Sequence, residues 1–95
     1  MRRDAMSRED AEAIAMAGLG VLAEDPSRIG RFFSLSGLDP SQIRELALTP
    51  AFQTAVLTHI RADESLLLTF AANLGIEPAK VAAAETLLAS QSKGG

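Results

Sequence analysis

The sequence has no cysteine, no tryptophan and no tyrosine, and it has only one histidine. Without cysteine the chain forms no disulfide, offers no thiolate nucleophile and supplies no sulfur ligand to zinc. Four phenylalanines are the only aromatic residues, so bases or sugar rings would find few side chains on which to stack. These absences disfavour disulfide-stabilised, zinc-binding and base-stacking proteins, and they fit a reducing compartment.

Residues that favour β-strands are also scarce. The chain has three valines, five isoleucines and five threonines, against 17 alanines and 13 leucines. Alanine and leucine lose little conformational freedom in a helix, whereas strands are enriched in β-branched and aromatic residues. With 95 residues, of which 47% are hydrophobic and 22% charged, the chain has the size and composition of one globular domain. We predict an all-α fold, a compact bundle of five or six short helices, in a single domain over residues 1–95.

Charge and hydropathy bear on nucleic acid and membranes. Nine basic and twelve acidic side chains give a net charge of −3, which disfavours binding to a phosphate backbone. An uncharged, mostly apolar stretch at residues 13–23 is shorter than the roughly 20 residues that span a membrane. It also differs from a signal peptide, because acidic residues 9, 10 and 12 precede it and Glu24 follows it. We expect a helix of the mature protein, no membrane partner and a cytoplasmic location.

Proline and capping residues mark where helices begin. Three prolines directly follow a good capping residue, in the pairs Asp25-Pro26, Asp39-Pro40 and Thr49-Pro50. Proline is tolerated at the first helical position, where its missing N–H costs nothing. Ser7 with Asp10 resembles a capping box, and Asp63 is a further cap. Gly37 and Gly75 are placed to end helices in a left-handed conformation.

These signals divide the chain into six helices joined by connections of one to four residues. The predicted helices cover residues 8–24, 26–36, 40–47, 50–61, 64–74 and 78–91. Residues 1–5 and 92–95 are expected to be frayed ends, with an ordered part of about 7–91.

Two helices have compositions that predict how they pack. The helix at 64–74 is apolar nearly all round, which favours the centre of the bundle. The helix at 8–24 contains Gly18 and Gly20, each of which lowers helix stability by about 1 kcal/mol relative to alanine. We expect both glycines to allow another helix to approach closely.

An internal similarity emerges when the chain is shifted by 38 residues. The shift places Asp25 on Asp63, Phe32 on Phe70, Gly37 on Gly75 and Pro40 on Pro78. Helix pairs that repeat at this length occur in stacked repeat proteins. Either a duplication or the common chemistry of a helix–glycine turn–helix corner explains the similarity.

One spacing favours DNA binding. Ala71, Gly75 and Val81 are spaced like the small residue, the turn glycine and the aliphatic residue of a helix-turn-helix. The second helix would contact the bases, yet Lys80 is the only residue in its first half of the types that make bidentate base contacts. We therefore expect no nucleic-acid partner and keep a DNA-associated protein as the alternative function.

Residues for catalysis or metal binding are few. The only possible metal ligands close to His59 in sequence are Asp63 and Glu64. Together the three residues are too small a ligand set for a specific zinc site. Most acidic residues lie at helix starts, where capping explains them, and the chain has no nucleophile elbow and no phosphate-binding loop. We expect no enzyme activity, no cofactor and no metal; a small enzyme subunit is a third hypothesis.

Binding to another protein is the function that these exclusions leave. Arg28, Arg31 and Arg44 form a possible partner surface on two consecutive helices. The alternative is ordinary solvated charge, paired with Glu24, Asp25 or Glu45. The sequence names no partner and does not determine the oligomeric state.

The chain also resembles a bacterial family of small all-helical proteins of unknown function. The resemblance rests on LAEDPSRIGRFFSLSGLDPSQIREL and PAFQTAVLTHIRADESLLLTFAANLGIEPAKVAAA, and the region from Ala11 to Leu88 covers about four-fifths of the chain. Its Gly-Leu-Asp-Pro and Asp-Glu-Ser-Leu-Leu elements are distinctive together, and neither is a catalytic signature. The resemblance implies a small helical protein and assigns no active-site residue.

Overall fold

The computed structural model describes residues 6–93, and helices account for most of them. The elements are α1 (Arg8–Ala23), α2 (Pro26–Ser36), a 3₁₀ turn (Pro40–Gln42), α3 (Ile43–Leu46), α4 (Pro50–Arg61), α5 (Glu64–Leu74) and α6 (Pro78–Lys93). No strand occurs within this range, so the predicted all-α fold is confirmed. The expected frayed ends at 1–5 and 94–95 lie outside the described residues, whereas α6 continues through residues 92 and 93 instead of ending at 91.

The predicted capping residues begin the helices. The Ser7 hydroxyl accepts a hydrogen bond from the Asp10 backbone N–H, and the Asp10 carboxylate accepts one from the Ser7 N–H, which completes a capping box. The carboxylates of Asp25, Asp39 and Asp63 likewise accept from backbone N–H groups in the first turns of α2, the 3₁₀ turn and α5. These bonds satisfy N–H groups that have no partner within the helix.

The two predicted turn glycines adopt the left-handed conformation, with φ of 75° at Gly37 and 71° at Gly75. Residues with a β-carbon rarely adopt these angles. The 38-residue similarity covers these turns, but the helices that follow differ in length. The first turn is followed by the 3₁₀ turn and the four residues of α3, and the second by the 16 residues of α6.

The predicted helix at 40–47 is divided into the 3₁₀ turn and α3. Gln42 has φ −103° and ψ 14°, which interrupts the helix between the two parts. Thr49 joins α3 to α4, because its hydroxyl donates to the Leu46 carbonyl at 2.7 Å and accepts from the Phe52 N–H at 3.3 Å. One side chain therefore satisfies the end of one helix and the start of the next.

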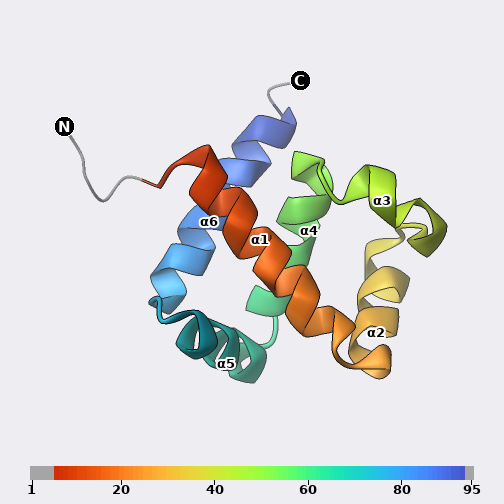
Figure 1. Ribbon diagram of the computed structural model, residues 1–95, viewed down its shortest axis with the longest axis horizontal. Coiled ribbons are helices and arrows are strands. Elements are labelled where there is room, and N and C mark those ends of the chain that lie inside the picture. The colour runs from red at the N-terminus through yellow and green to blue at the C-terminus, as the bar shows by residue number, and fades with distance from the viewer. Residues whose placement is uncertain (1–5, 94–95) are drawn as a thin grey trace.

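The core lies between α1, α4 and α6, and α1 crosses the other two in Figure 1. Its largest buried hydrophobic side chains are Phe32, Phe52, Phe70, Leu22, Leu57, Ile60 and Leu88. Gly18 is buried against α4, as predicted, and a β-carbon there would meet Val56 and Ile60. The same prediction is wrong for Gly20, which is exposed and has nothing within 4 Å of the position of a β-carbon.

The prediction that the helix at 64–74 occupies the centre is wrong. Leu68 is 50% exposed and Leu74 39%, and only Leu66, Phe70 and Ala71 of α5 are buried. Short turns connect α5 to α4 and α6, and α5 lies at one end of the molecule in Figure 1. The centre belongs instead to α4, which buries five side chains.

The lengths and compositions of the helices in residues 6–93 bear on membrane spanning. No single helix among them is both long enough and apolar enough to cross a membrane. Helices α5 and α6 reach the required length and composition only as a pair, and that pair is bent by 99°.

Candidate protein-binding surface

Helix α2 separates two hollows, and its residues divide between them with helical periodicity. Ile29 and Phe33, four residues apart, line an apolar hollow on one side. Arg28, Arg31 and Leu35 line a polar groove on the other. Residues three or four apart share a helix face, so the sequence of α2 gives each hollow its own chemistry. We call the set Arg28, Ile29, Arg31, Phe33, Leu35 and Leu38 the α2 surface.

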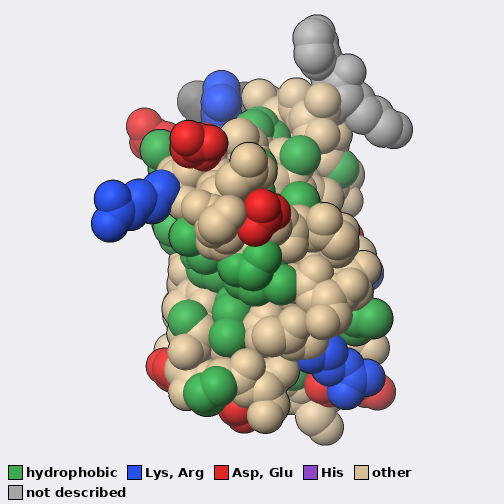
Figure 2. Space-filling model, turned by 90° about the vertical axis from the view of Figure 1, so that its right-hand side faces the viewer, with side chains coloured by type: hydrophobic (Ala, Val, Ile, Leu, Met, Phe, Trp, Pro, Cys, Tyr) green, Lys and Arg blue, Asp and Glu red, His purple; other side chains and the backbone are tan. Residues whose placement is uncertain are grey.

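The apolar hollow has a volume of about 500 Å³ and extends from α2 to Leu38 and Pro40 in the following turn. Ile29, Phe33 and Leu38 are half-buried there. Figure 2 looks onto this side of the molecule and shows hydrophobic side chains across the middle of the face, with basic and acidic side chains around them. Leu35 is 68% exposed, so α2 keeps apolar side chains in contact with solvent on both of its flanks.

The polar groove has a volume of about 570 Å³ and lies between α2 and the junction of α4 with α5. Arg28 and Arg31 line it from α2, and His59, Asp63 and Glu64 line it from the other side. Two of the acidic groups at the groove are occupied by capping. The carboxylate of Asp25 accepts from the Ser27 N–H at 2.9 Å, and that of Asp63 accepts from the Leu66 N–H at 3.2 Å.

The two arginines of the groove form no ion pair with any acidic residue in the part of the chain that the structure describes. The two ion pairs found there join Arg8 to Glu12 and Arg61 to Glu85. The groove is also lined by the acidic side chains of Asp25, Asp63 and Glu64, so it offers charges of both signs to a partner.

His59 lies at the boundary between the groove and the core. Its imidazole ring meets the ring of the buried Phe32 edge to face, with centroids 5.3 Å apart. Burial lowers the pKa of His59 from its ordinary value, the Arg31 charge lowers it further, and Asp63 acts in the opposite direction. The lowered pKa favours the neutral imidazole of His59, which lines the groove.

The structure brings together two of the three arginines that the sequence singled out. Arg28 and Arg31 share the groove, whereas Arg44 is exposed on α3 and does not line it. None of the three forms the ion pairs that the sequence suggested with Glu24, Asp25 or Glu45, within residues 6–93.

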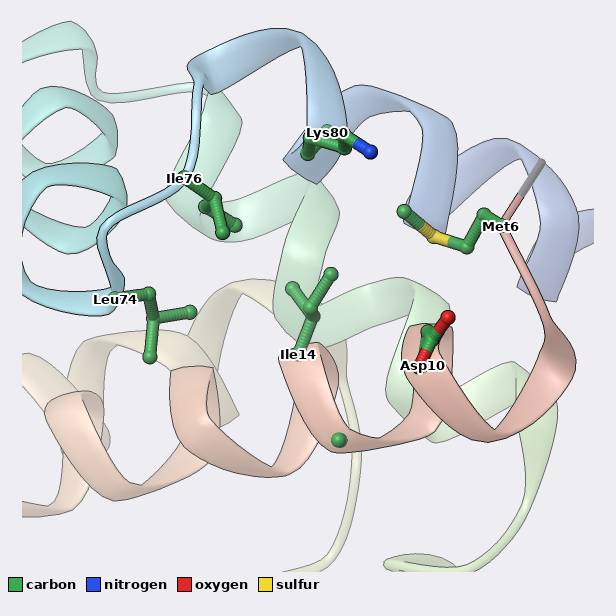
Figure 3. Close-up of a pocket in the computed structure, with 7 residues that line it drawn as sticks. Met6, Asp10, Ile14, Leu74, Ile76 and Lys80 are labelled. Carbon is green, nitrogen blue, oxygen red and sulfur yellow. The ribbon is translucent and has the colours of Figure 1, made fainter. Parts of the chain in front are cut away.

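A third hollow, of about 340 Å³, lies between the first half of α1 and the turn from α5 to α6. Figure 3 shows its apolar floor of Ile14 and Ile76, with Leu74 toward one end and Met6 and Lys80 toward the other. Asp10 also lines it, so its two charged groups have opposite signs. This hollow is separate from the α2 surface.

The corner between α5 and α6 has the geometry of a helix-turn-helix. Ala71 and Val81 are buried, Gly75 is left-handed, and the two helices meet at 99°, within the usual range of this motif. The surroundings are not basic. Glu77 lines a shallow hollow together with Lys80 at the start of α6, and Asp10 lines the adjacent one. Acidic groups at this position oppose the approach of phosphate.

No group of three or more histidine, cysteine, aspartate or glutamate side chains in residues 6–93 is arranged to hold a metal ion. His59, Asp63 and Glu64 line the same groove, but their side chains are not arranged to hold a metal ion.

A family model covers residues 8–91 and is described as a protein of unknown function, DUF3572. The chain belongs to the DUF3572 family. No curated protein and no solved structure matches the chain. The resemblance stated from the sequence is therefore confirmed at the level of the family, and membership of DUF3572 assigns no activity or partner.

Sequence reasoning found the arginines of this DUF3572 chain but missed the apolar part of the α2 surface. Ile29 and Phe33 have the four-residue spacing of a stripe that faces a core, and Leu35 lies on the other flank, yet only Phe32 of α2 is buried. A signal was present, because α2 has apolar residues on more of its circumference than one contact with the core can cover.

Proposed function

We propose that this domain acts by binding another protein through the α2 surface, and that it does so without catalysis. The supporting observation is the state of α2: one of its residues is buried, while Ile29, Phe33 and Leu35 remain half-buried or exposed beside two unpaired arginines. Apolar surface of this kind with a polar rim marks interaction sites. Phenylalanine and arginine are also enriched at protein interfaces, where lysine is depleted.

The absence of catalysis is part of the proposal. His59 is the sole histidine of the sequence, and two of the acidic groups at its groove cap helices. A general acid–base pair needs two titratable groups held in a pocket with distinct pKa values. Capping accounts for these aspartates without such a role.

We further propose a cytoplasmic location in a bacterium. The lack of cysteine fits a reducing compartment. The bacterial source rests on the resemblance of the sequence to its family. Fractionation of the native host followed by detection of the chain with an antibody tests the location, and recovery in the secreted or membrane fraction would contradict it.

Affinity capture from the native host, with mass spectrometry of the retained proteins, tests the binding function. We compare the unmodified chain with L35S and with L68S, which replaces a leucine that is also exposed but lies on α5. We expect specific partners to be retained by the unmodified chain and by L68S and to be lost with L35S. Equal retention by L35S and L68S would show that α2 is not the binding surface.

DNA binding remains the second candidate because the α5–α6 corner has the geometry described above. An electrophoretic mobility assay at low salt, with micromolar protein and a duplex of mixed sequence, tests it. We expect no shifted band, since Lys80 is the only base-reading side chain in the first half of α6. A shift that is lost in K80A and retained in R31A would support the helix-turn-helix hypothesis over the α2 surface.

A further inference from the structure

We propose that residues 26–48, which contain α2, the 3₁₀ turn and α3, open as one unit while α1, α4, α5 and α6 stay folded. We call these residues the α2–α3 segment. Figure 1 shows α2 and α3 at one edge of the molecule, away from α5. The inference goes beyond the proposed function and holds whether or not a partner binds the α2 surface.

The α2–α3 segment contributes a single buried residue to the core. Phe32 is fully buried, and its ring meets the rings of Phe52 and His59 at centroid distances of 5.8 and 5.3 Å. The 3₁₀ turn and α3 bury no residue, and the other apolar side chains of the segment that pack against the core are only half-buried. By comparison, α1 buries four residues and α4 five. Because burial of apolar surface is the main source of stability, the segment is held less firmly than the central helices.

Polar contacts add little to this attachment. Apart from bonds to the adjoining residues at its two ends, one side-chain hydrogen bond joins the segment to the rest of the described chain, the 3.0 Å donation from Gln53 Nε2 to the Ala47 carbonyl. Both ion pairs found in residues 6–93 lie outside the segment. The segment is therefore fixed mainly at two points, Phe32 in α2 and Ala47 after α3. Regions with few buried contacts are those that open locally.

The similar corner in the second half of the chain serves as an internal reference. A shift of 38 residues places the α2–α3 segment on α5, its turn and the first part of α6. Ala71 and Val81 of that corner are buried, whereas their counterparts Phe33 and Ile43 are half-buried. Both corners therefore have the same turn chemistry, and only the second is packed closely into the core.

The segment opens as a unit because neither of its helices is stable alone. Helix α2 has 11 residues and α3 has four, and isolated helices shorter than about 12–15 residues are marginal in water. Once Phe32 leaves the core, α2 has no buried contact and too few residues to remain helical. The 3₁₀ turn and α3 bury nothing of their own, so they open together with α2.

Opening exchanges one surface of the domain for another. The closed segment presents the whole α2 surface, because the six residues of that surface all lie within residues 26–48. The open segment uncovers the rings of Phe52 and His59, which Phe32 contacts in the closed state. A ligand that binds only one of these surfaces shifts the equilibrium toward that state. The segment thus gives the domain a two-state element.

Native-state hydrogen exchange of the full chain, followed residue by residue by NMR, tests the inference. We expect the amides of α2 and α3 to share one opening equilibrium, with protection at least about 100-fold lower than that of α4 and α6. Protection of α2 and α3 equal to that of α4 and α6 would mean that residues 26–48 open only when the whole domain unfolds, and it would overturn the inference.

Two glycines give a matched pair of variants. Gly20 in α1 and Gly30 in α2 are both exposed, and a β-carbon at either would meet nothing within 4 Å. Alanine stabilises a helix interior relative to glycine by an amount equivalent to about fivefold in an equilibrium constant. G30A should therefore slow exchange about fivefold in the segment and in α4 and α6. G20A stabilises α1, which stays folded when the segment opens, so it should slow exchange in α4 and α6 and leave the segment unchanged.

The two variants also give the results that would contradict the inference. If G20A slows exchange in the segment as much as in α4, the segment opens only with the whole domain. If G30A slows exchange only at the amides beside Gly30, the amides of the segment open one at a time. Retention of captured partners by L35S would contradict the proposed function and would leave these exchange results unaffected, so the two failures are distinguishable.

Discussion

The backbone of Gly18 in α1 lies against the side chain of Ile60 in α4, so closely that a β-carbon at position 18 would be 2.8 Å from Cδ1 of Ile60. Val56 Cγ1 would be 3.1 Å away. Real β-carbons do not approach other atoms to less than 3.0 Å, so glycine sets how closely α1 and α4 pack.

Replacing Gly18 with leucine should therefore destabilise the fold. Inserting a side chain into a packed core typically costs about 1–3 kcal/mol, and we expect the free energy of unfolding of G18L to fall by about 2 kcal/mol. Urea unfolding followed by circular dichroism measures the change. G20L is the control, because position 20 is open and glycine is the poorer helix former; it should be as stable as the unmodified chain or more so.

The buried amide of Gln53 holds the turn between α3 and α4. Its Nε2 donates to the Ala47 carbonyl at 3.0 Å, and the side chain is almost fully buried. We expect Q53A to lower the free energy of unfolding by about 1–2 kcal/mol, because the cavity and the carbonyl left without its donor outweigh the removal of Gln53 Oε1, which is buried without a partner among the described residues. A loss below about 0.5 kcal/mol, well under the usual cost of an unsatisfied buried group, would show that the bond does not hold the turn.

Replacing Thr54, the residue next to Gln53, is expected to change the free energy of unfolding in the opposite direction. The Thr54 hydroxyl oxygen is buried and has no hydrogen-bond partner among the described residues. Because an unsatisfied buried polar group is unfavourable, T54V should raise the free energy of unfolding by up to about 1 kcal/mol. Denaturant unfolding of T54V beside Q53A measures both changes, and a destabilised T54V would indicate that the hydroxyl has a partner in solution.

His59 makes stability depend on pH in a defined direction. Its pKa is lowered in the folded state, first by burial and then by Arg31, so the unfolded chain binds the proton more tightly. The contribution of His59 to stability is complete above the pKa of the unfolded chain, about 6.5, and is lost as the pH falls through that value toward the lower folded pKa. Between pH 7.5 and 5, the free energy of unfolding should fall more for the unmodified chain than for H59Q.

Proton NMR measures the pKa of His59 directly, because a single histidine gives one Cε1 proton signal. R31Q should raise the pKa of His59, since the Arg31 charge lowers it, and D63N should lower it, since Asp63 raises it. Movement of the pKa in the reverse direction in either variant would contradict the arrangement of charges in the groove.

Glu85 connects α6 to α4 by accepting from the Thr58 hydroxyl and the Arg61 guanidinium. The Glu85 side chain is 16% exposed, so solvent screens this pair less than a fully exposed one. We expect E85A to lower the free energy of unfolding by about 1 kcal/mol. E12A, which removes an exposed pair within α1, should cost only about 0.2–0.5 kcal/mol, and equal losses would show that the α4–α6 contact adds nothing.

The helices were predictable because their boundaries are local. A cap at Asp25 or Asp63 satisfies backbone groups two or three residues away, and Gly75 ends α5 through its own backbone angles. The burial of α5 was not predictable from its composition. An apolar helix is central only if other helices surround it, and the turns on both sides of α5 place it at the end of the α4–α6 pair.

The candidate site likewise has features that are local in sequence and features that depend on contacts between distant helices. The sequence shows Arg28 and Arg31 on one helix face, because residues three apart share a face. It does not show that Phe33 stays partly exposed while the adjacent Phe32 is buried and meets Phe52 and His59. Which of two adjacent apolar residues faces the core depends on where α4 lies, and that is a contact between distant parts of the chain.

The all-α class, the caps and the starts of the predicted helices follow from composition and from interactions over a few residues, and the family follows from the sequence. Contacts between distant parts of the chain determine that Gly18 and not Gly20 receives a neighbouring helix, that Arg44 lies apart from Arg28 and Arg31, and that α2 keeps an apolar flank uncovered. These features could not be read from one helix because the burial of a residue depends on both of the surfaces that meet there. A helix carries its own hydrogen bonds, whereas its exposure is set by whatever packs against it.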